Sequence, residues 1–134
     1  DDLNFLNSSL QEHFYTLFES GLPYAYEIIE RCSKIMLEQD DANVITLSNV
    51  ATCKMMKEEY AEALTFINKA YSINANDEII INNAGFCHWK LGHPEDAKRY
   101  YVKALEMAKA ENNTDAVEYY QGQIDIMNKA IENR

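Results

Sequence analysis

Helix-breaking residues are scarce in this chain of 134 residues, which contains only 4 Gly and 2 Pro. An all-β fold with many tight turns would need more of both, so the composition favours a helical protein. Long apolar runs are also absent, and none approaches the roughly 20 residues of a membrane-spanning helix. The length suffices to bury a core, and we expect a single domain over residues 1–134.

Positive charge is scarce as well. The sequence has 12 Lys and Arg against 22 Asp and Glu, a formal net charge of −10, and residues 1–30 contain no Lys or Arg. Proteins that bind nucleic acid or anionic membranes present basic surfaces to the phosphate groups. We therefore expect neither a nucleic acid nor a membrane as partner.

Cysteine is limited to three residues, which cannot all pair within one chain, and no CxxC motif occurs. Unpaired thiols are typical of a reducing compartment, so they favour the cytoplasm. The chain begins at Asp1 without Met, so its targeting stays open, and it can be a fragment of a larger protein.

What the sequence does contain is a repeat of 34 residues. Residues 51–71 (ATCKMMKEEYAEALTFINKAY) align with residues 85–105 (GFCHWKLGHPEDAKRYYVKAL). The aligned pairs include Ala51 with Gly85, Cys53 with Cys87, Ala63 with Ala97, and Ala70 with Ala104. A fixed period of this size is typical of stacked helical repeats, and each small residue marks a close approach of two helices.

This pattern resembles the tetratricopeptide repeat (TPR) family, which has the same period. That family places a small residue late in a first helix, then Ala-x3-aromatic and another Ala in a second helix. Gly85, Ala97, Tyr101 and Ala104 fill these places. The resemblance implies an all-α fold, a right-handed α-α superhelix (solenoid) of stacked helix pairs.

We expect about three TPR-like helix pairs and a C-terminal capping helix. Residues 1–38 form a degenerate pair with a first helix at about 2–19, residues 44–77 and 78–111 form two clear units, and residues 113–133 form the capping helix. Gly92 suits the end of one helix and Pro94 the start of the next. Thr114 is the expected N-cap of the last helix.

The stretch GFCHWKLGH, residues 85–93, contains two imidazoles and a thiol, which are ligand types for zinc or copper. Cys87 and His88 are adjacent, however, and adjacent helical residues point in different directions. In the repeat, Cys32, Cys53 and Cys87 occupy positions that favour a small buried residue. We therefore expect repeat core here, with no metal and no cofactor.

Catalytic motifs are missing too. The sequence has no Gly-rich phosphate loop and no GxSxG. Acidic pairs such as Glu58/Glu59 lie at predicted helix starts, where the helix dipole favours them. We expect no catalytic residue and no enzyme activity.

The TPR resemblance implies a concave groove lined by the first helix of each pair. We expect this groove to include Ile45, Ser48, Asn49, Thr52, Met56, Asn82, Asn83, Phe86, Trp89 and Lys90. Asn49 and Asn83 are 34 residues apart, and an amide can donate to and accept from a partner's backbone. Two alternatives stay open: the Asn pair can be merely solvated, and Trp89 fits the core as well as the groove.

The leading hypothesis is a non-catalytic adaptor that binds a peptide or helix of a partner protein. The net charge favours a neutral, apolar or basic partner. The TPR clamp for acidic chaperone tails needs basic residues where Ile79 and Asn83 stand. The alternative is a structural or assembly domain that forms a homodimer through its last helix, using Val117, Tyr120, Ile124 and Met127.

Overall fold

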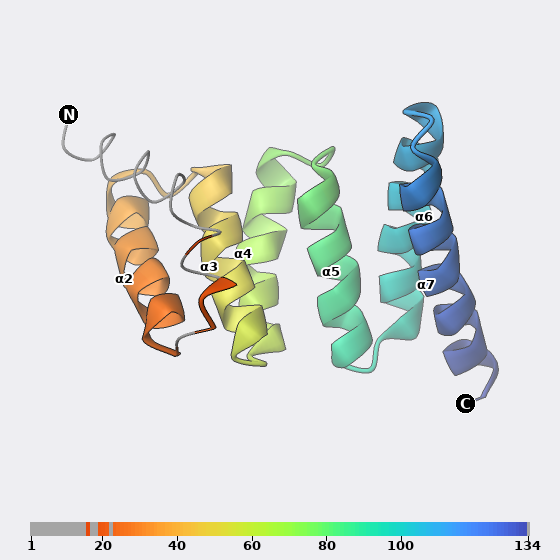
Figure 1. Cartoon of the computed structure of the whole chain (residues 1–134), viewed down its shortest axis with the longest axis horizontal. Coiled ribbons are helices and arrows are strands. Elements are labelled where there is room, and N and C mark those ends of the chain that lie inside the picture. Colours follow the sequence, from red (N-terminus) through yellow and green to blue (C-terminus); the bar gives the residue numbers. More distant parts are fainter. Residues whose placement is uncertain (1–15, 17–18, 22, 134) are drawn as a thin grey trace. The chain divides into compact units, whose positions relative to one another are not determined.

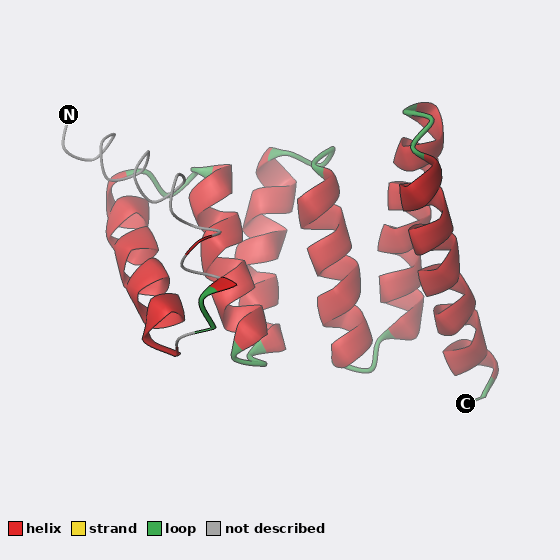
Figure 2. Ribbon diagram, viewed as in Figure 1, coloured by secondary structure: helices red, strands yellow, loops and turns green. Residues whose placement is uncertain are grey.

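The computed structural model describes residues 16, 19–21 and 23–133, and it contains six named helices and no strand in that part of the chain (Figures 1 and 2). The helices are α2 (Pro23–Gln39), α3 (Val44–Met56), α4 (Tyr60–Ile73), α5 (Glu78–Lys90), α6 (Pro94–Ala110) and α7 (Thr114–Glu132). The expected first helix, about residues 2–19, lies almost entirely outside the described residues.

The chain divides into two compact units, Asp1–Ile73 and Asn74–Arg134. In the first unit, α3 packs against both α2 and α4. In the second unit, α6 packs against both α5 and α7. Short turns join successive helices within each unit (Figure 2). The repeat bounds that the sequence predicts remain a prediction.

Helix starts follow the 34-residue period. The Asn43 side chain accepts a hydrogen bond from the backbone N–H of Thr46 at 3.0 Å, and Asp77 caps α5 in the same way. These caps satisfy amide groups that have no partner within their own helix. The expected cap of the last helix is wrong by one residue, because Asn113 rather than Thr114 accepts from the N–H of Ala116.

Helix ends are periodic as well. Gly92 ends α5 with φ +80°, and Pro94 begins α6, as the sequence predicts. The equivalent residue 34 positions earlier is Glu58, which adopts φ 60° without being glycine. Left-handed backbone is unusual for such a side chain, so the turn geometry is kept although the glycine is not.

The predicted small residues form the core. Ala51, Ala63 and Ala70 are buried in the first unit, and Gly85, Ala97 and Ala104 are buried in the second. Among the described residues, Tyr101 is the largest fully buried side chain, and it lies in the second unit. Burial of these apolar surfaces is the main driving force for packing the helices together.

Candidate functional site

The face of α3 that the sequence assigned to a groove is partly exposed. Ile45 is 53% exposed and Met56 is 47% exposed, which is high for large apolar side chains. Ser48 and Thr52 are half-buried, and the Thr52 hydroxyl donates to the Ser48 carbonyl oxygen at 2.9 Å. The helix therefore offers apolar contact area at both ends.

Asn49, which the sequence also assigns to the groove, is buried instead. Its side chain was expected on an open face, but it is only 7% exposed. Its Nδ2 atom has no hydrogen-bond partner among the described residues. The cause lies in packing, because α3 has a neighbouring helix on two sides within the first unit. A buried amide without a partner is costly, so Asn49 holds an unused hydrogen-bond donor.

The corresponding face of α5 is more open. Ile79 is 61% exposed, and it stands 34 residues after Ile45. Asn82 and Asn83 are half-buried, and the Tyr119 hydroxyl donates to Asn82 Oδ1 at 3.5 Å. Both exposed isoleucines thus occupy the same repeat position.

Aromatic side chains follow on the same helix. Phe86 and Trp89 are half-buried, and Lys90 is exposed. The Lys90 ammonium lies 5.5 Å from the centre of the Phe86 ring, which is a cation–π contact. Trp89 is neither fully buried nor fully exposed, so its role in the groove remains a prediction.

Three lysines of the first unit are gathered around one buried carboxylate. Glu30 is 5% exposed, and it forms ion pairs with Lys34, Lys54 and Lys57. Burial pushes the pKa of Glu30 upward, but hydrogen bonds from Lys57, Lys54 and Lys34 outweigh this and hold the pKa at about 2. The carboxylate is therefore charged at all physiological pH values.

Lys54 is the centre of this network. It is 8% exposed, and its ammonium lies 2.9 Å from Glu30, 3.1 Å from Glu59 and 2.9 Å from Glu62. Hydrogen bonds to Glu62 and Glu30 raise its pKa against the effect of burial. Its positive charge is fully used inside the protein, so it is not available to bind an acidic ligand.

Two of the three cysteines are buried as predicted. Cys53 and Cys87 are fully buried, and burial raises the pKa of each thiol to about 12. The expectation of full burial is wrong for Cys32, which is half-buried. Ser33 takes the fully buried place, because the inward face of α2 runs through Ile29, Ser33 and Met36.

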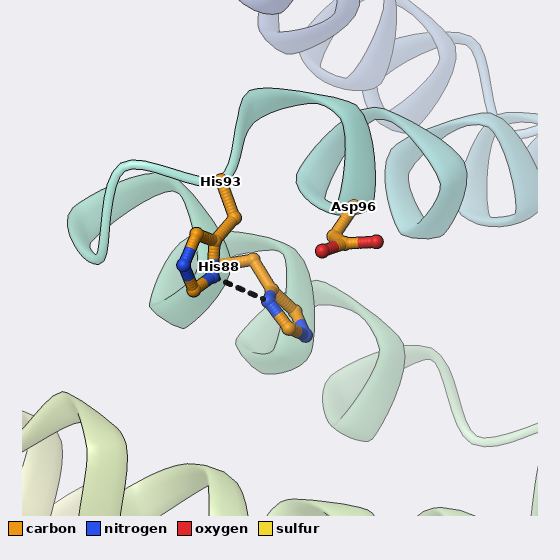
Figure 3. A group of neighbouring side chains, drawn as sticks. All are labelled: His88, His93 and Asp96. Carbon is orange, nitrogen blue, oxygen red and sulfur yellow. Dashed lines mark hydrogen bonds between the residues drawn. The ribbon is translucent and has the colours of Figure 1, made fainter.

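The histidines of the opening stretch lie together. His88 Nδ1 and His93 Nδ1 are 3.5 Å apart, and Asp96 lies beside them (Figure 3). Desolvation lowers the pKa of His88, against an opposing effect of Asp96. The sequence predicts repeat core at residues 85–93 and does not predict this group, which includes Asp96. The signal that predicts it is Gly92, because a helix-ending turn there folds the next residue back toward the last turn.

Most of the apolar face of the last helix is buried within the second unit. Of the four residues that the homodimer alternative assigns to an interface, Tyr120, Ile124 and Met127 are at most 6% exposed, and Val117 is half-buried. The Tyr120 hydroxyl also donates to Glu78 Oε1 on α5 at 2.6 Å. Among the described residues, no helix is long and apolar enough to cross a membrane.

Solved structures with the same fold are TPR domains and secretion chaperones. One is the first TPR of Spaghetti (RPAP3) bound to an HSP90 peptide. Its TM-score is 0.76 at 19% identity, and the match covers 97% of this chain and 93% of that one. PcrH, in complex with the chaperone binding region of PopD, has a TM-score of 0.75 at 14% identity, over 92% and 93% of the two chains. SycD, the type III secretion translocator chaperone of Yersinia enterocolitica, has a TM-score of 0.77 at 14% identity, over 98% and 96%.

These similarities define the class: the chain has an all-α, TPR-like solenoid fold, as its 34-residue period predicts. The family is shown by a match of the sequence to a family model. The family model of the coatomer epsilon subunit matches residues 25–123. The chain therefore belongs to the coatomer epsilon subunit family.

Proposed function

We propose that this chain is a non-catalytic subunit of a coatomer and that it binds another protein of that assembly through the exposed faces of α3 and α5. Family membership supports the assembly, since the matching family is a coatomer subunit. Two proteins of the same fold have names that describe bound protein segments, the PopD region and the HSP90 peptide. These names support a binding role rather than a catalytic one.

The observation that carries the proposal is the pair of exposed isoleucines at equivalent repeat positions, Ile45 on α3 and Ile79 on α5. An exposed large aliphatic side chain costs free energy in water, and burying one against a partner recovers roughly 1.5–3 kcal/mol. Aromatic and methionine side chains are enriched at the centre of protein interfaces, and Met56, Phe86 and Trp89 lie on the same helices.

The partner segment is apolar or basic rather than acidic. The chain has a formal net charge of −10, so an acidic segment would be repelled at long range. The lysines of the first unit that could hold a carboxylate, Lys54 and Lys57, are engaged by Glu30. The sequence predicts one groove that joins the faces of α3 and α5. The binding surface proposed here requires only that each of these two faces is exposed.

The self-association alternative receives less support. Three of the four α7 residues that it named, Tyr120, Ile124 and Met127, are buried within their own unit, and Val117 is half-buried, so these residues offer little apolar surface to a second copy. A homodimer through this helix would have to use Tyr119 and Ile126, which are exposed on it.

The test is a quantitative mass-spectrometric pull-down from the source cell with the variant Ile45→Glu/Ile79→Glu. The chain offers a matched control, Ile35→Glu/Ile126→Glu, because these two isoleucines are 54% and 45% exposed on α2 and α7. We expect the first variant to lose the other coatomer subunits and the control to keep them. Retention by the first variant, or loss by the control alone, would contradict the proposed surface.

A further inference from the structure

A group of metal-ligating side chains lies where α5 ends and α6 begins. His88 is in the last turn of α5, His93 is in the connecting turn, and Asp96 is in the first turn of α6. One ligand atom from each lies within 4.8 Å of the other two, and all three side chains point toward one another (Figure 3). The proposed protein-binding role uses none of these residues.

The backbone holds the two histidines in place. The N–H of His93 donates to the His88 carbonyl oxygen at 2.8 Å, and the N–H of Gly92 donates to the Trp89 carbonyl oxygen at 3.1 Å. This pair of bonds is a Schellman motif, which requires the left-handed backbone that Gly92 adopts. Such motifs usually bring two apolar side chains into contact, and here they bring two imidazoles together.

The capping of α6 does not explain the position of His93, and the position of His88 is fixed by a neighbouring ring. His93 is the N-cap residue of α6, but its side chain makes no capping hydrogen bond. His88 stacks on Tyr100 with ring centres 5.6 Å apart and an interplanar angle of 12°, which fixes the orientation of the imidazole. A ligand ring that is oriented by its neighbours loses less entropy on binding a metal.

The spacing of the ring nitrogens fits a tetrahedral ion. Zinc binds histidine nitrogen at about 2.0–2.1 Å, so two nitrogens on one tetrahedral ion lie roughly 3.3 Å apart. His88 Nδ1 and His93 Nδ1 are 3.5 Å apart without any ion. We propose that His88, His93 and Asp96 bind one Zn²⁺ ion, with a water molecule as the fourth ligand.

Arg99 competes with the metal for the third ligand. Its guanidinium forms an ion pair with Asp96 one turn further along α6. The pair is exposed, so breaking it costs little. Removing Arg99 therefore frees the carboxylate and strengthens zinc binding, a change that a merely structural histidine contact would not produce.

The test is isothermal titration of the whole chain with ZnCl₂ at neutral pH. The background is Cys32→Ser, because this half-buried thiol is a competing zinc ligand. We expect one zinc ion per chain, affinity at least about tenfold weaker in His88→Ala and in His93→Ala, and affinity up to about fivefold tighter in Arg99→Ala. His13→Ala removes the third histidine of the sequence and should leave the affinity unchanged.

Two results would overturn the proposal. One is the absence of zinc binding in the background protein, and the other is equal affinity in the background protein and in the His88→Ala/His93→Ala double variant. Thermal unfolding with and without ZnCl₂ gives a second readout if a variant folds poorly, since an ion bound only to the folded state raises Tm. The pull-down of the proposed function is independent of this test, because its variants leave all three ligands intact.

Discussion

Gly85 on α5 lies directly against the ring of Tyr101 on α6, so that a Cβ atom at residue 85 would be 2.9 Å from Tyr101 Cζ. Real Cβ atoms essentially never approach another heavy atom so closely. Tyr101 is fully buried, so its ring has no open space into which to move. This contact explains why residue 85 must be small.

Gly85→Ala should therefore destabilise the protein, although alanine is the better helix former. The helix-propensity gain is about 1 kcal/mol, whereas overpacking a tight core costs about 1–3 kcal/mol and a displaced Tyr101 ring adds to that. We expect a net loss of about 1–2 kcal/mol in the free energy of unfolding, measured by urea denaturation.

Gly122→Ala is the matched control. Gly122 lies within α7, is exposed, and has nothing within 4 Å of the added Cβ atom. The same substitution should stabilise the protein here by about 0.5–1 kcal/mol. Equal effects at both positions would show that the Tyr101 contact does not restrict residue 85.

The Glu30 network predicts a loss of stability in acid. The pKa of Glu30 is about 2 in the folded chain and about 4.5 in an ordinary glutamate. A lowered pKa contributes stability that is complete above pH 4.5 or so and disappears as the pH falls toward 2. The contribution is of the order of 3 kcal/mol at neutral pH.

Glu30→Gln removes this charge and measures the effect. The free energy of unfolding of the variant should be lower than that of the parent at neutral pH, and the difference should shrink between about pH 4.5 and pH 2. Glu106→Gln changes an exposed residue of α6 and should have little effect at any pH. A difference that does not depend on pH would contradict the role assigned to the carboxylate.

The cysteines should differ in reactivity toward Ellman's reagent. A thiol reacts with this reagent in its thiolate form. Because the pKa of Cys53 and of Cys87 is raised to about 12, almost no thiolate is present at either residue at neutral pH. We expect one thiol to react in the folded protein and three to react in urea. Cys32→Ser should abolish the reaction of the folded protein, and fast labelling of that variant would show that a buried cysteine is accessible.

Asn83→Ala/Trp89→Ala tests the polar and aromatic part of the α5 face. We expect this double variant to lose its coatomer partners in the pull-down, because a backbone hydrogen bond and an aromatic anchor are removed together. Its melting temperature should stay within a few degrees of that of the parent, as circular dichroism can check. Normal capture by a folded variant would remove these residues from the binding surface.

Much of the fold follows from the sequence because the 34-residue period is a local and repeated signal. Small residues at fixed spacing identify the helix contacts, and Gly92 and Pro94 identify one turn. The N-cap of α7 was missed by one residue because Asn113 and Thr114 are both good capping residues, and only the backbone geometry distinguishes them.

The site was harder to predict because burial depends on neighbours that the repeat does not specify. Asn49 and Asn83 occupy the same repeat position, yet one is buried and the other half-buried. Lys54 and His88 also share one repeat position. Lys54 forms ion pairs with three carboxylates, whereas His88 contacts a histidine. The repeat does not specify these partners, because the residues aligned with Glu59 and His93 in the other unit are His93 and Glu59.

The most direct measurement of the central claim is site-specific photo-crosslinking in the source cell. A photo-crosslinking amino acid replaces Ile79 in one protein and Ile126 in another, since both are exposed isoleucines of the second unit. Our account predicts that position 79 crosslinks to another coatomer subunit and that position 126 does not. Crosslinks to that subunit from position 126 alone, or from neither position, would contradict it.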